Sequence, residues 1–156
     1  MDWTEFDSSR CSVARAAGVV GDAWTVLVLR DLFNGIRRFD DLTEHLGIAR
    51  NVLTRRLSAL VDEGIVVRVP YREPGSRERH EYRLTAAGRD LRPVILAMLA
   101  WGDVHRADGF GPPMRVEHAE CGAGVHVELR CDEGHLVTPT TRLRAVPGPG
   151  ARVAAD

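Results

Sequence analysis

Several features are scarce or missing in this sequence of 156 residues, and each absence excludes a class of protein. No run of 18 apolar residues occurs, and the first residues (MDWTE) are acidic where a secretory signal would be basic and then apolar. The three cysteines are too few for a disulfide scaffold. We therefore expect a cytoplasmic protein that is neither exported nor held in a membrane.

Lysine is absent, so all 21 basic side chains are arginines, and the net charge is only -1. This balance excludes a strongly basic protein that coats nucleic acid, but it hides a local concentration of charge. Residues 49–92 carry ten arginines against six acidic residues, a net of +4, whereas both flanking segments are net negative. Because guanidinium groups make bidentate contacts with phosphate and guanine, we expect the middle third to contact a polyanion.

Motifs that would hold a cofactor or a catalytic nucleophile are missing as well. The chain has no glycine-rich phosphate loop, no nucleophile elbow and no zincin helix. We therefore expect no cofactor and no enzymatic activity. The alternative in this class is a thiol-dependent enzyme that uses Cys11 or Cys121 with a histidine base.

Apolar periodicity predicts four helices in the first 63 residues, over 12–20, 23–33, 39–46 and 49–63. Gly47 and Gly64 follow the last two helices, where glycine commonly closes a helix. In the last helix Leu53, Leu57 and Leu60 share one face, which leaves a polar, arginine-bearing face directed away from the core. The apolar face expected for the second helix consists of Trp24, Leu27, Val28 and Leu32.

A β-hairpin and one further helix are predicted after residue 64. Residues 65–72 and 80–84 are rich in β-branched and aromatic side chains and flank turn residues at 73–76, which predicts two paired strands with an arginine-rich tip. Thr85 can cap the next helix, in which Pro93 should cause a kink or mark a later start.

These parts are those of a winged helix-turn-helix. The 49–63 helix would enter the major groove by its N-terminal end, where arginine can fork onto guanine and asparagine onto adenine, while the hairpin tip reaches nearby phosphates or the minor groove. The candidates for contact with double-stranded DNA are Arg38, Arg50, Asn51, Thr54, Arg55, Arg56, Arg77 and Arg79. The pattern alone is equally compatible with a solvated helical face and a charged hairpin, and a winged helix that binds only protein is a further alternative.

The expected fold class is mainly α with a β-hairpin wing, a winged helix-turn-helix with a small β-rich C-terminal appendage. The segment GFGPP (109–113) marks the one clear boundary in the sequence. We therefore divide the chain into a winged domain with dimerisation helices over 1–108, an extension of short strands over 109–146 and a frayed tail over 147–156.

Ordered matches to one known family extend over residues 11–102. They comprise Cys11, GDAWTVLVLRDLFNGIRRFDDL (21–42), VLTRRLSALVDEGIVVR (52–68), a wing with Tyr71 and Pro74, EYRLT (81–85), the Gly88 and Leu91 pair, and Trp101-Gly102. This region closely resembles the HxlR family of winged-helix regulators, which is related to the MarR repressors. The resemblance implies a homodimeric, sequence-specific DNA-binding repressor or activator. The chain departs from the family at Ala23, where lysine is frequent, and at Ala49, where serine is frequent.

The helix after residue 90 is too apolar for one winged domain to cover, which independently predicts a homodimer. Two copies related by a two-fold axis would hold their groove-entering helices about 34 Å apart and require a near-palindromic operator. The alternative is that this helix folds back on its own domain. The interface candidates are Leu91, Val94, Ile95, Met98 and Trp101.

Cys11 is the candidate sensor of an oxidant or an electrophile. A thiol at a helix N-terminus, with Arg10 and Arg15 nearby, has its reactive thiolate favoured. The resemblance adds that similar family members sense electrophiles or oxidants with an N-terminal cysteine. The alternative is a small buried residue that packs the first helix.

The tail offers a possible metal site, although we assign no metal to it. Two pairs, each of one histidine and one cysteine, have a spacing that suits the ligands of a tetrahedral zinc ion. The alternatives are a disulfide between Cys121 and Cys131, or side chains that simply pack in the fold. His126 is expected to be an ordinary strand residue. The four candidate zinc ligands are His118, Cys121, Cys131 and His135.

A small-molecule effector could bind between Trp24, the long C-terminal helix and the tail.

Overall fold

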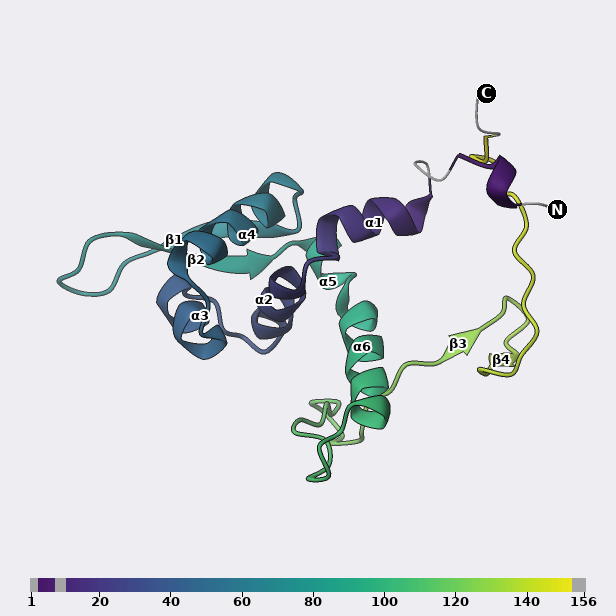
Figure 1. The fold of residues 1–156 in the computed structure, drawn as a ribbon. Helices are drawn as coiled ribbons and strands as arrows, with labels where there is room; N and C mark the ends of the chain where they lie inside the picture. The colour runs from purple at the N-terminus through teal and green to yellow at the C-terminus, as the bar shows by residue number, and fades with distance from the viewer. Residues whose placement is uncertain (1–2, 8–10, 153–156) are drawn as a thin grey trace. The chain divides into compact units, whose positions relative to one another are not determined.

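The computed structural model describes residues 3–7 and 11–152 (Figure 1). In these ranges a 3₁₀ turn (Trp3–Glu5) precedes the other elements. They are, in order, α1 (Ser12–Val20), α2 (Ala23–Phe33), α3 (Phe39–Leu46), α4 (Arg50–Asp62), β1 (Val66–Tyr71), β2 (Arg79–Leu84), α5 (Ala86–Arg89), α6 (Arg92–His105), β3 (Leu129–Arg130) and β4 (Leu136–Val137). The four N-terminal helices and the hairpin are confirmed.

The elements form two compact units. One contains the chain through Asp90 together with the residues from Val146 onward, and the other is Leu91–Ala145. The division therefore falls at the start of α6, ahead of the GFGPP segment at 109–113. The functional boundaries at residues 108 and 146 stay a prediction.

The core of the first unit is a cluster of leucine and valine side chains between α2, α3 and α4. The α4 stripe that the sequence predicts is confirmed, because Leu53, Leu57 and Leu60 are at most 1% exposed. In α2, however, Trp24 and Leu27 are only half-buried, and the buried arc instead includes Thr25, Leu29 and Asp31 beside the predicted pair Val28 and Leu32. Trp24 and Leu27 thus lie at the margin of the apolar face.

A tight turn joins α3 to α4. Gly47 adopts the left-handed conformation (φ 61°) that closes α3, and Ile48, 3% exposed, anchors the turn in the core. Ala49 is the N-cap of α4 and makes no side-chain capping bond, as its missing hydroxyl predicts. The two helices are therefore held as a helix-turn-helix with the N-terminus of α4 open to solvent.

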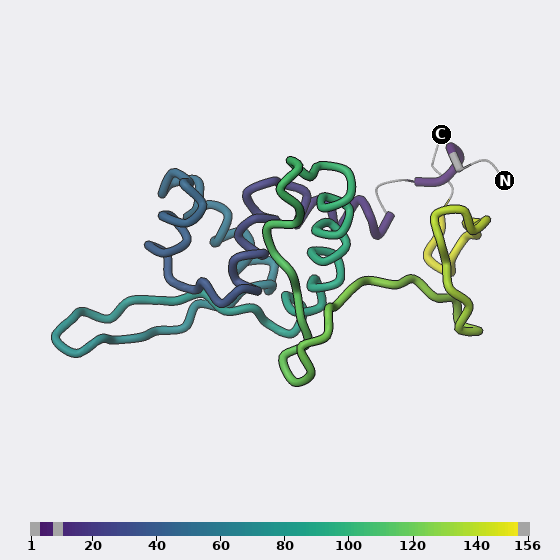
Figure 2. Tube along the Cα trace, turned by 90° about the horizontal axis from the view of Figure 1, so that it is seen from below, coloured from purple at the N-terminus to yellow at the C-terminus, as the bar shows by residue number. Residues whose placement is uncertain are grey.

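The hairpin follows α4 directly. Its strands are antiparallel, in a register that runs from Val66 opposite Leu84 to Tyr71 opposite Arg79. The backbone N–H of Tyr82 donates to the carbonyl of Arg37 (2.8 Å), which ties the base of the hairpin to the segment ahead of α3. Figures 1 and 2 both show the hairpin loop projecting away from α2, α3 and α4 as a wing.

The helix expected after Thr85 is divided in two. The Thr85 hydroxyl accepts from the backbone N–H of Gly88 and caps the four-residue α5, and the 14-residue α6 begins only at Arg92. Pro93 lies in the first turn of α6, where its missing N–H costs no helical hydrogen bond. Of the two outcomes predicted for this proline, the later start is therefore confirmed.

Most of residues 106–145 is irregular. Strand pairing in this described segment is limited to the two-residue β3–β4 ladder and one bridge between Glu117 and Gly124. His126 lies outside these strands, so its assignment as a strand residue is wrong. Glycine and proline residues interrupt the segment and keep its strands short. Strands of two residues bury little apolar surface, so they do not stabilise a longer ladder.

Two backbone hydrogen bonds involve the described part of the predicted tail, whose frayed character stays a prediction. The N–H of Ala151 donates to the carbonyl of Gly148, and the N–H of Asp7 donates to the carbonyl of Arg152 (both 3.0 Å). Residues 153–156 lie outside the described residues.

No single helix in the described ranges is long and apolar enough to cross a membrane. Among the helices that the structure describes, only α1 and α2 taken together reach that length and hydropathy, and they are bent by 78° relative to each other.

Candidate nucleic-acid interface

The predicted DNA-contacting residues lie on α4, on the hairpin and at the start of α3. All are solvent-exposed except Arg56, which is half-buried. On α4, the Thr54 hydroxyl donates to the carbonyl of Arg50, and the Asn51 side-chain oxygen accepts from the N–H of Val52. Neither bond uses the amide nitrogen of Asn51, so this group can donate to a base.

Asp40, in the first turn of α3, holds two of the candidate arginines. Its Oδ1 accepts from Nη1 of Arg50 at 2.7 Å, and its Oδ2 lies 3.8 Å from Nη1 of Arg79. The hydrogen bond from Arg50 holds the pKa of the Asp40 carboxyl below its ordinary value, and the charges of Arg50 and Arg79 lower it further. Arg50 also lies over the ring of Phe39, with Cζ 4.7 Å from the ring centroid.

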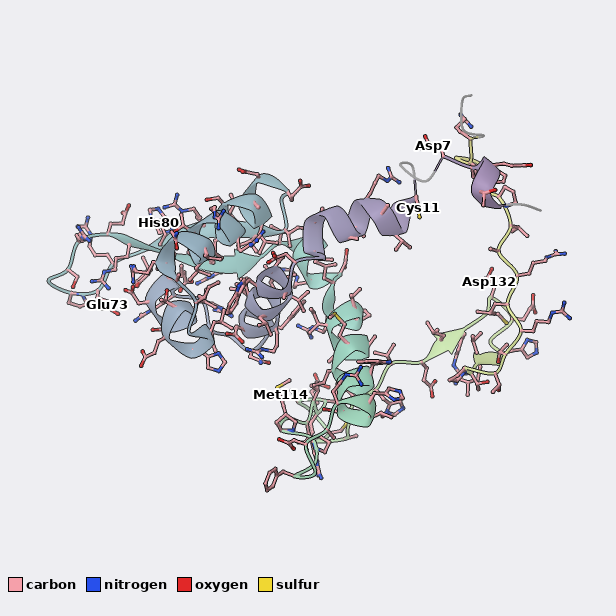
Figure 3. All side chains as sticks on the ribbon, viewed as in Figure 1. Asp7, Cys11, Glu73, His80, Met114 and Asp132 are labelled. Carbon is pink, nitrogen blue, oxygen red and sulfur yellow. The ribbon has the colours of Figure 1, made fainter. Side chains whose placement is uncertain are left out.

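Arg38 repeats this arrangement beside the loop end of the hairpin. Its guanidinium lies over the Tyr71 ring (4.7 Å from Cζ to the centroid), and its Nη1 is 2.8 Å from Oε1 of Glu73. Figure 3 shows Glu73 on the hairpin loop. An aromatic ring and a carboxylate thus restrain Arg38 as they restrain Arg50.

Arg56 makes a contact within the fold. Its Nη2 lies 2.8 Å from Oδ2 of Asp22, and its Nε is buried with no hydrogen-bond partner among the described residues. Asp22 is also the N-cap of α2, where its Oδ1 accepts from the N–H of Thr25 at 3.2 Å. Arg56 therefore joins α4 to the N-terminus of α2.

Two of the candidates are unrestrained. Neither Arg55 on α4 nor Arg77 on the wing has a side-chain hydrogen bond or ion pair within the described ranges of the chain. Their guanidinium groups are exposed, so all of their donors are available to an external anion.

A buried carboxylate with two partly exposed partners joins α2 to α3, and sequence patterns did not predict it. Asp31 is 0% exposed; its Oδ1 accepts from Nε of Arg30 (2.9 Å) and its Oδ2 lies 2.7 Å from Nδ1 of His45. The signal available in the sequence was one acid inside the apolar run WTVLVLRDLF. A carboxylate so deeply buried needs partners from other residues, and these fix how α3 packs on α2.

The helix-turn-helix and the wing can be compared with known proteins. The model of the HxlR-like helix-turn-helix family matches residues 19–109. The chain belongs to this family. The HTH-type transcriptional regulator Rv3095 of Mycobacterium tuberculosis, itself uncharacterized, is 43% identical to it over 139 residues, which are 89% of this chain and 87% of Rv3095. The HxlR-like chain is therefore a DNA-binding transcriptional regulator and not an enzyme.

Solved structures share the HxlR-like fold. PA1607, a candidate transcription factor, has a TM-score of 0.76 and 36% identity, over 87% of this chain and 95% of its own. The redox regulator HypR in its reduced form has a TM-score of 0.54 and 31% identity, over 60% of this chain and 92% of its own. The winged helix-turn-helix predicted from the sequence is confirmed.

Cys11 of this HxlR-like protein is the N-cap residue of α1 and is exposed (Figure 3). In this structure it therefore does not pack as a small buried residue. The side chain makes no capping hydrogen bond, but the nearby backbone N–H groups of Ala14 and Val13 favour the thiolate and lower the pKa of the thiol, and Arg15 adds a smaller electrostatic contribution. Arg10 lies outside the described residues.

The four possible zinc ligands form two separate pairs. Cys121 Sγ is 3.3 Å from Nδ1 of His118, and Cys131 Sγ is 3.4 Å from Nδ1 of His135. The described residues contain no group of three or more histidine, cysteine or acidic side chains that could hold a metal ion. The two cysteines are free and exposed, so the structure supports neither the disulfide nor the packing alternative.

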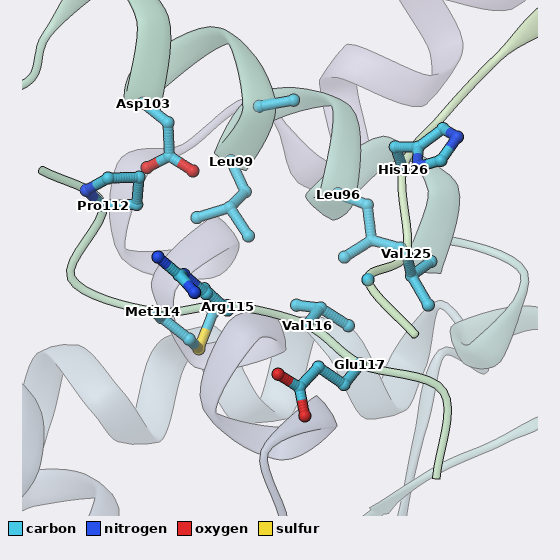
Figure 4. Close-up of a pocket in the computed structure, with 12 residues that line it drawn as sticks. Leu96, Leu99, Asp103, Pro112, Met114, Arg115, Val116, Glu117, Val125 and His126 are labelled. Carbon is cyan, nitrogen blue, oxygen red and sulfur yellow. The ribbon is translucent and has the colours of Figure 1, made fainter. Parts of the chain in front are cut away.

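A cavity of about 330 Å³ lies within the second unit (Figure 4). Its apolar lining includes Leu96 and Leu99 of α6, and Asp103 and Arg115 lie among its charged lining residues. Trp24 does not line this cavity, and the effector pocket expected beside Trp24 stays a prediction.

Proposed function

We propose that the protein is a homodimeric repressor in the cytoplasm that binds a near-palindromic operator. The N-terminal end of α4 enters the major groove, and the wing lies against the flanking backbone. The observation that carries this proposal is the cluster of exposed arginines on these two elements, with Arg55 and Arg77 unrestrained in the described structure. Asn51, Thr54 and Arg50 complete the groove-facing end of α4, whereas Arg77, Arg79 and Arg38 contact phosphates.

The exposed apolar side chains of α6 support a homodimer. Val94, Met98 and Trp101 are 45%, 50% and 55% exposed, and Leu91 and Ile95 are half-buried. A second copy would remove this surface from water, and a two-fold axis would give the operator its symmetry. We place the DNA-binding and dimerising functions in residues 1–108 and an accessory function in 109–146. A dimer that covers its operator excludes polymerase, so repression needs no additional surface.

Cys11 is the proposed sensor. Its exposure, its lowered thiol pKa and the likeness of the chain to the redox regulator HypR all support this role. Oxidation or alkylation at the start of α1 would change how the two copies pack and so change the spacing of their α4 helices. Cys11→Ser should bind the operator and no longer respond to diamide or hypochlorite. If this variant still releases DNA on oxidation, the sensor lies elsewhere.

In vitro selection from random DNA duplexes with the purified protein tests the proposal. One enriched sequence with two-fold symmetry is expected. Because a dimer with these arginines would neutralise about six to ten phosphates, its affinity for that duplex should fall about 10³- to 10⁵-fold between 50 and 200 mM salt. Failure to enrich any sequence, or affinity that does not depend on salt, would contradict the proposal.

A further inference from the structure

One acidic side chain lies among the arginines of the proposed interface and contacts both of its parts. Asp40 uses one carboxylate oxygen for Arg50, at the N-terminus of α4, and the other for Arg79, at the start of β2. All three side chains are more than half exposed, at 61%, 66% and 53% respectively. A carboxylate in this position lies on a surface that must approach a polyanion, where its charge opposes binding.

The geometry around Arg50 suggests what this carboxylate does. The guanidinium has the Phe39 ring on one face and the Asp40 carboxylate at Nη1, and these two contacts restrain its orientation. The contact with Asp40 uses Nη1, which leaves the edge formed by Nε and Nη2 for another acceptor. That edge presents two parallel N–H donors, the pattern that matches O6 and N7 of guanine.

We propose that Asp40 is a specificity-determining residue, which orients Arg50 for reading a guanine and opposes the use of Arg50 as a plain phosphate contact. The inference rests on the proposed entry of α4 into the major groove. A phosphate accepts an arginine from many directions, whereas a base edge accepts it from one. Fixing Arg50 in advance therefore favours the base contact, and the negative charge weakens binding to DNA of any sequence.

Asp41 provides a matched control within the same turn. It is exposed, it carries the same charge at the same helix N-terminus, and no side-chain partner is assigned to it in the described structure. Asp41→Asn removes one negative charge and one favourable helix-dipole interaction, as Asp40→Asn does. Only Asp40→Asn also removes the carboxylate that holds Arg50.

The experiment measures two dissociation constants by fluorescence anisotropy, for the duplex selected by the wild-type protein and for a scrambled duplex of the same composition. The quantity of interest is their ratio. The Asp40→Asn variant should bind the scrambled duplex at least as tightly as the wild-type protein does. The ratio of the dissociation constant for the scrambled duplex to that for the selected duplex should fall at least about fivefold. In Asp41→Asn both duplexes should gain affinity alike, so that the ratio stays within about twofold. Asp40→Glu, which keeps the charge, should retain most of the discrimination.

Arg50→Ala separates the two proposals. If this variant discriminates as well as the wild type, Arg50 does not read a base and the inference about Asp40 is overturned, whereas the proposed entry of α4 into the major groove is contradicted only if the selection enriches no sequence. If Arg50→Ala loses discrimination but Asp40→Asn does not, only the inference about Asp40 is overturned. Equal losses of discrimination in Asp40→Asn and Asp41→Asn also overturn the inference about Asp40, because removal of one negative charge would then explain both. In the Arg50→Ala background, Asp40→Asn should cause no further loss of discrimination.

Discussion

At the scale of single residues, Cys11 shows how a helix start changes the chemistry of a side chain. The thiolate would accept hydrogen bonds from the N–H groups of Ala14 and Val13, which have no acceptor within α1. These bonds favour the charged form, so the folded pKa is lower than the unfolded one. By linkage, the stabilisation that the thiolate provides is present above the unfolded pKa and is lost as the pH falls through the folded pKa.

This shift predicts the pH dependence of alkylation. In a Cys121→Ser/Cys131→Ser variant, Cys11 is the only thiol, so its reaction with iodoacetamide can be followed against pH in the native protein and in urea. The native midpoint should lie at the lower pH, because only the thiolate reacts. Coincident midpoints would show that the start of α1 does not stabilise the thiolate.

The arginines show what sequence can predict at this scale. Helical periodicity predicted the exposed face of α4, and it correctly placed Arg50 and Arg55 on it. It could not predict which arginines are restrained, because the carboxylates come from other parts of the chain: Asp40 from α3, Glu73 from the wing and Asp22 from the start of α2. Such pairs depend on tertiary packing, and spacing in the sequence does not indicate them.

At the scale of elements, Asp22 gives α2 its start and its connection to α4. Replacing it with alanine removes both the cap on Thr25 and the partner of Arg56. Asp22→Ala should lower the free energy of unfolding by about 1–2 kcal/mol, mostly through the cap. Asp22→Asn keeps a capping oxygen and should lose only a few tenths of a kcal/mol, because the ion pair is partly exposed. Urea unfolding of the two variants measures the difference, and equal losses would assign the effect to the ion pair instead.

The junction of α5 with the hairpin depends on a glycine. A Cβ at Gly88 would lie 2.2 Å from the carbonyl oxygen of Ile65 and 3.1 Å from Cδ2 of Leu84. The carbonyl belongs to the backbone that enters β1, so relief requires moving the hairpin away from α5. Gly88→Ala should therefore destabilise the protein by about 1–3 kcal/mol in thermal or urea unfolding.

Gly18, in the last turn of α1, is the matched control for this substitution. Nothing lies within 4 Å of a Cβ built there. Gly18→Ala should stabilise by about 0.5–1 kcal/mol, because alanine loses less conformational freedom in a helix. A loss of stability in Gly18→Ala, or none in Gly88→Ala, would contradict the packing that the structure shows.

Element boundaries could be predicted where a local signal marks them. Gly47 and Gly64 correctly indicated the ends of α3 and α4, and Pro93 indicated where α6 starts. The segment after residue 105 was predicted less well. Its apolar residues suggested short strands, but most of these residues have no neighbouring strand with which to pair. Val127 and Leu129, for example, are exposed instead of lying on a buried sheet face.

At the scale of the whole molecule, the family match and the full-length relatives cover different parts of the chain. The family model ends at residue 109, whereas the similarity to Rv3095 and PA1607 spans 89% and 87% of the chain. Residues after 109 are therefore shared with particular relatives and are not a general part of the HxlR-like domain. This supports the accessory role that we propose for the extension.

The proposed dimer predicts how affinity depends on half-site spacing. Two α4 helices held about 34 Å apart read half-sites separated by one turn of DNA. Inserting about five base pairs at the centre of the selected duplex moves one half-site to the opposite face of the helix. The wild-type affinity should then fall to that of a duplex with a single half-site, as measured by anisotropy at fixed salt.

A variant that cannot dimerise should be insensitive to that insertion. Trp101 is 55% exposed on α6, so an arginine there costs little in the isolated chain but would place two like charges in a symmetric interface. Trp101→Arg should sediment as a monomer and bind the original and the expanded duplexes with the same weak affinity. If Trp101→Arg stays dimeric and still distinguishes the two duplexes, the copies meet through another surface. If the wild type itself tolerates the insertion, its two α4 helices are not held at a fixed distance, because a rigid two-fold dimer cannot engage both half-sites once they face opposite sides of the DNA.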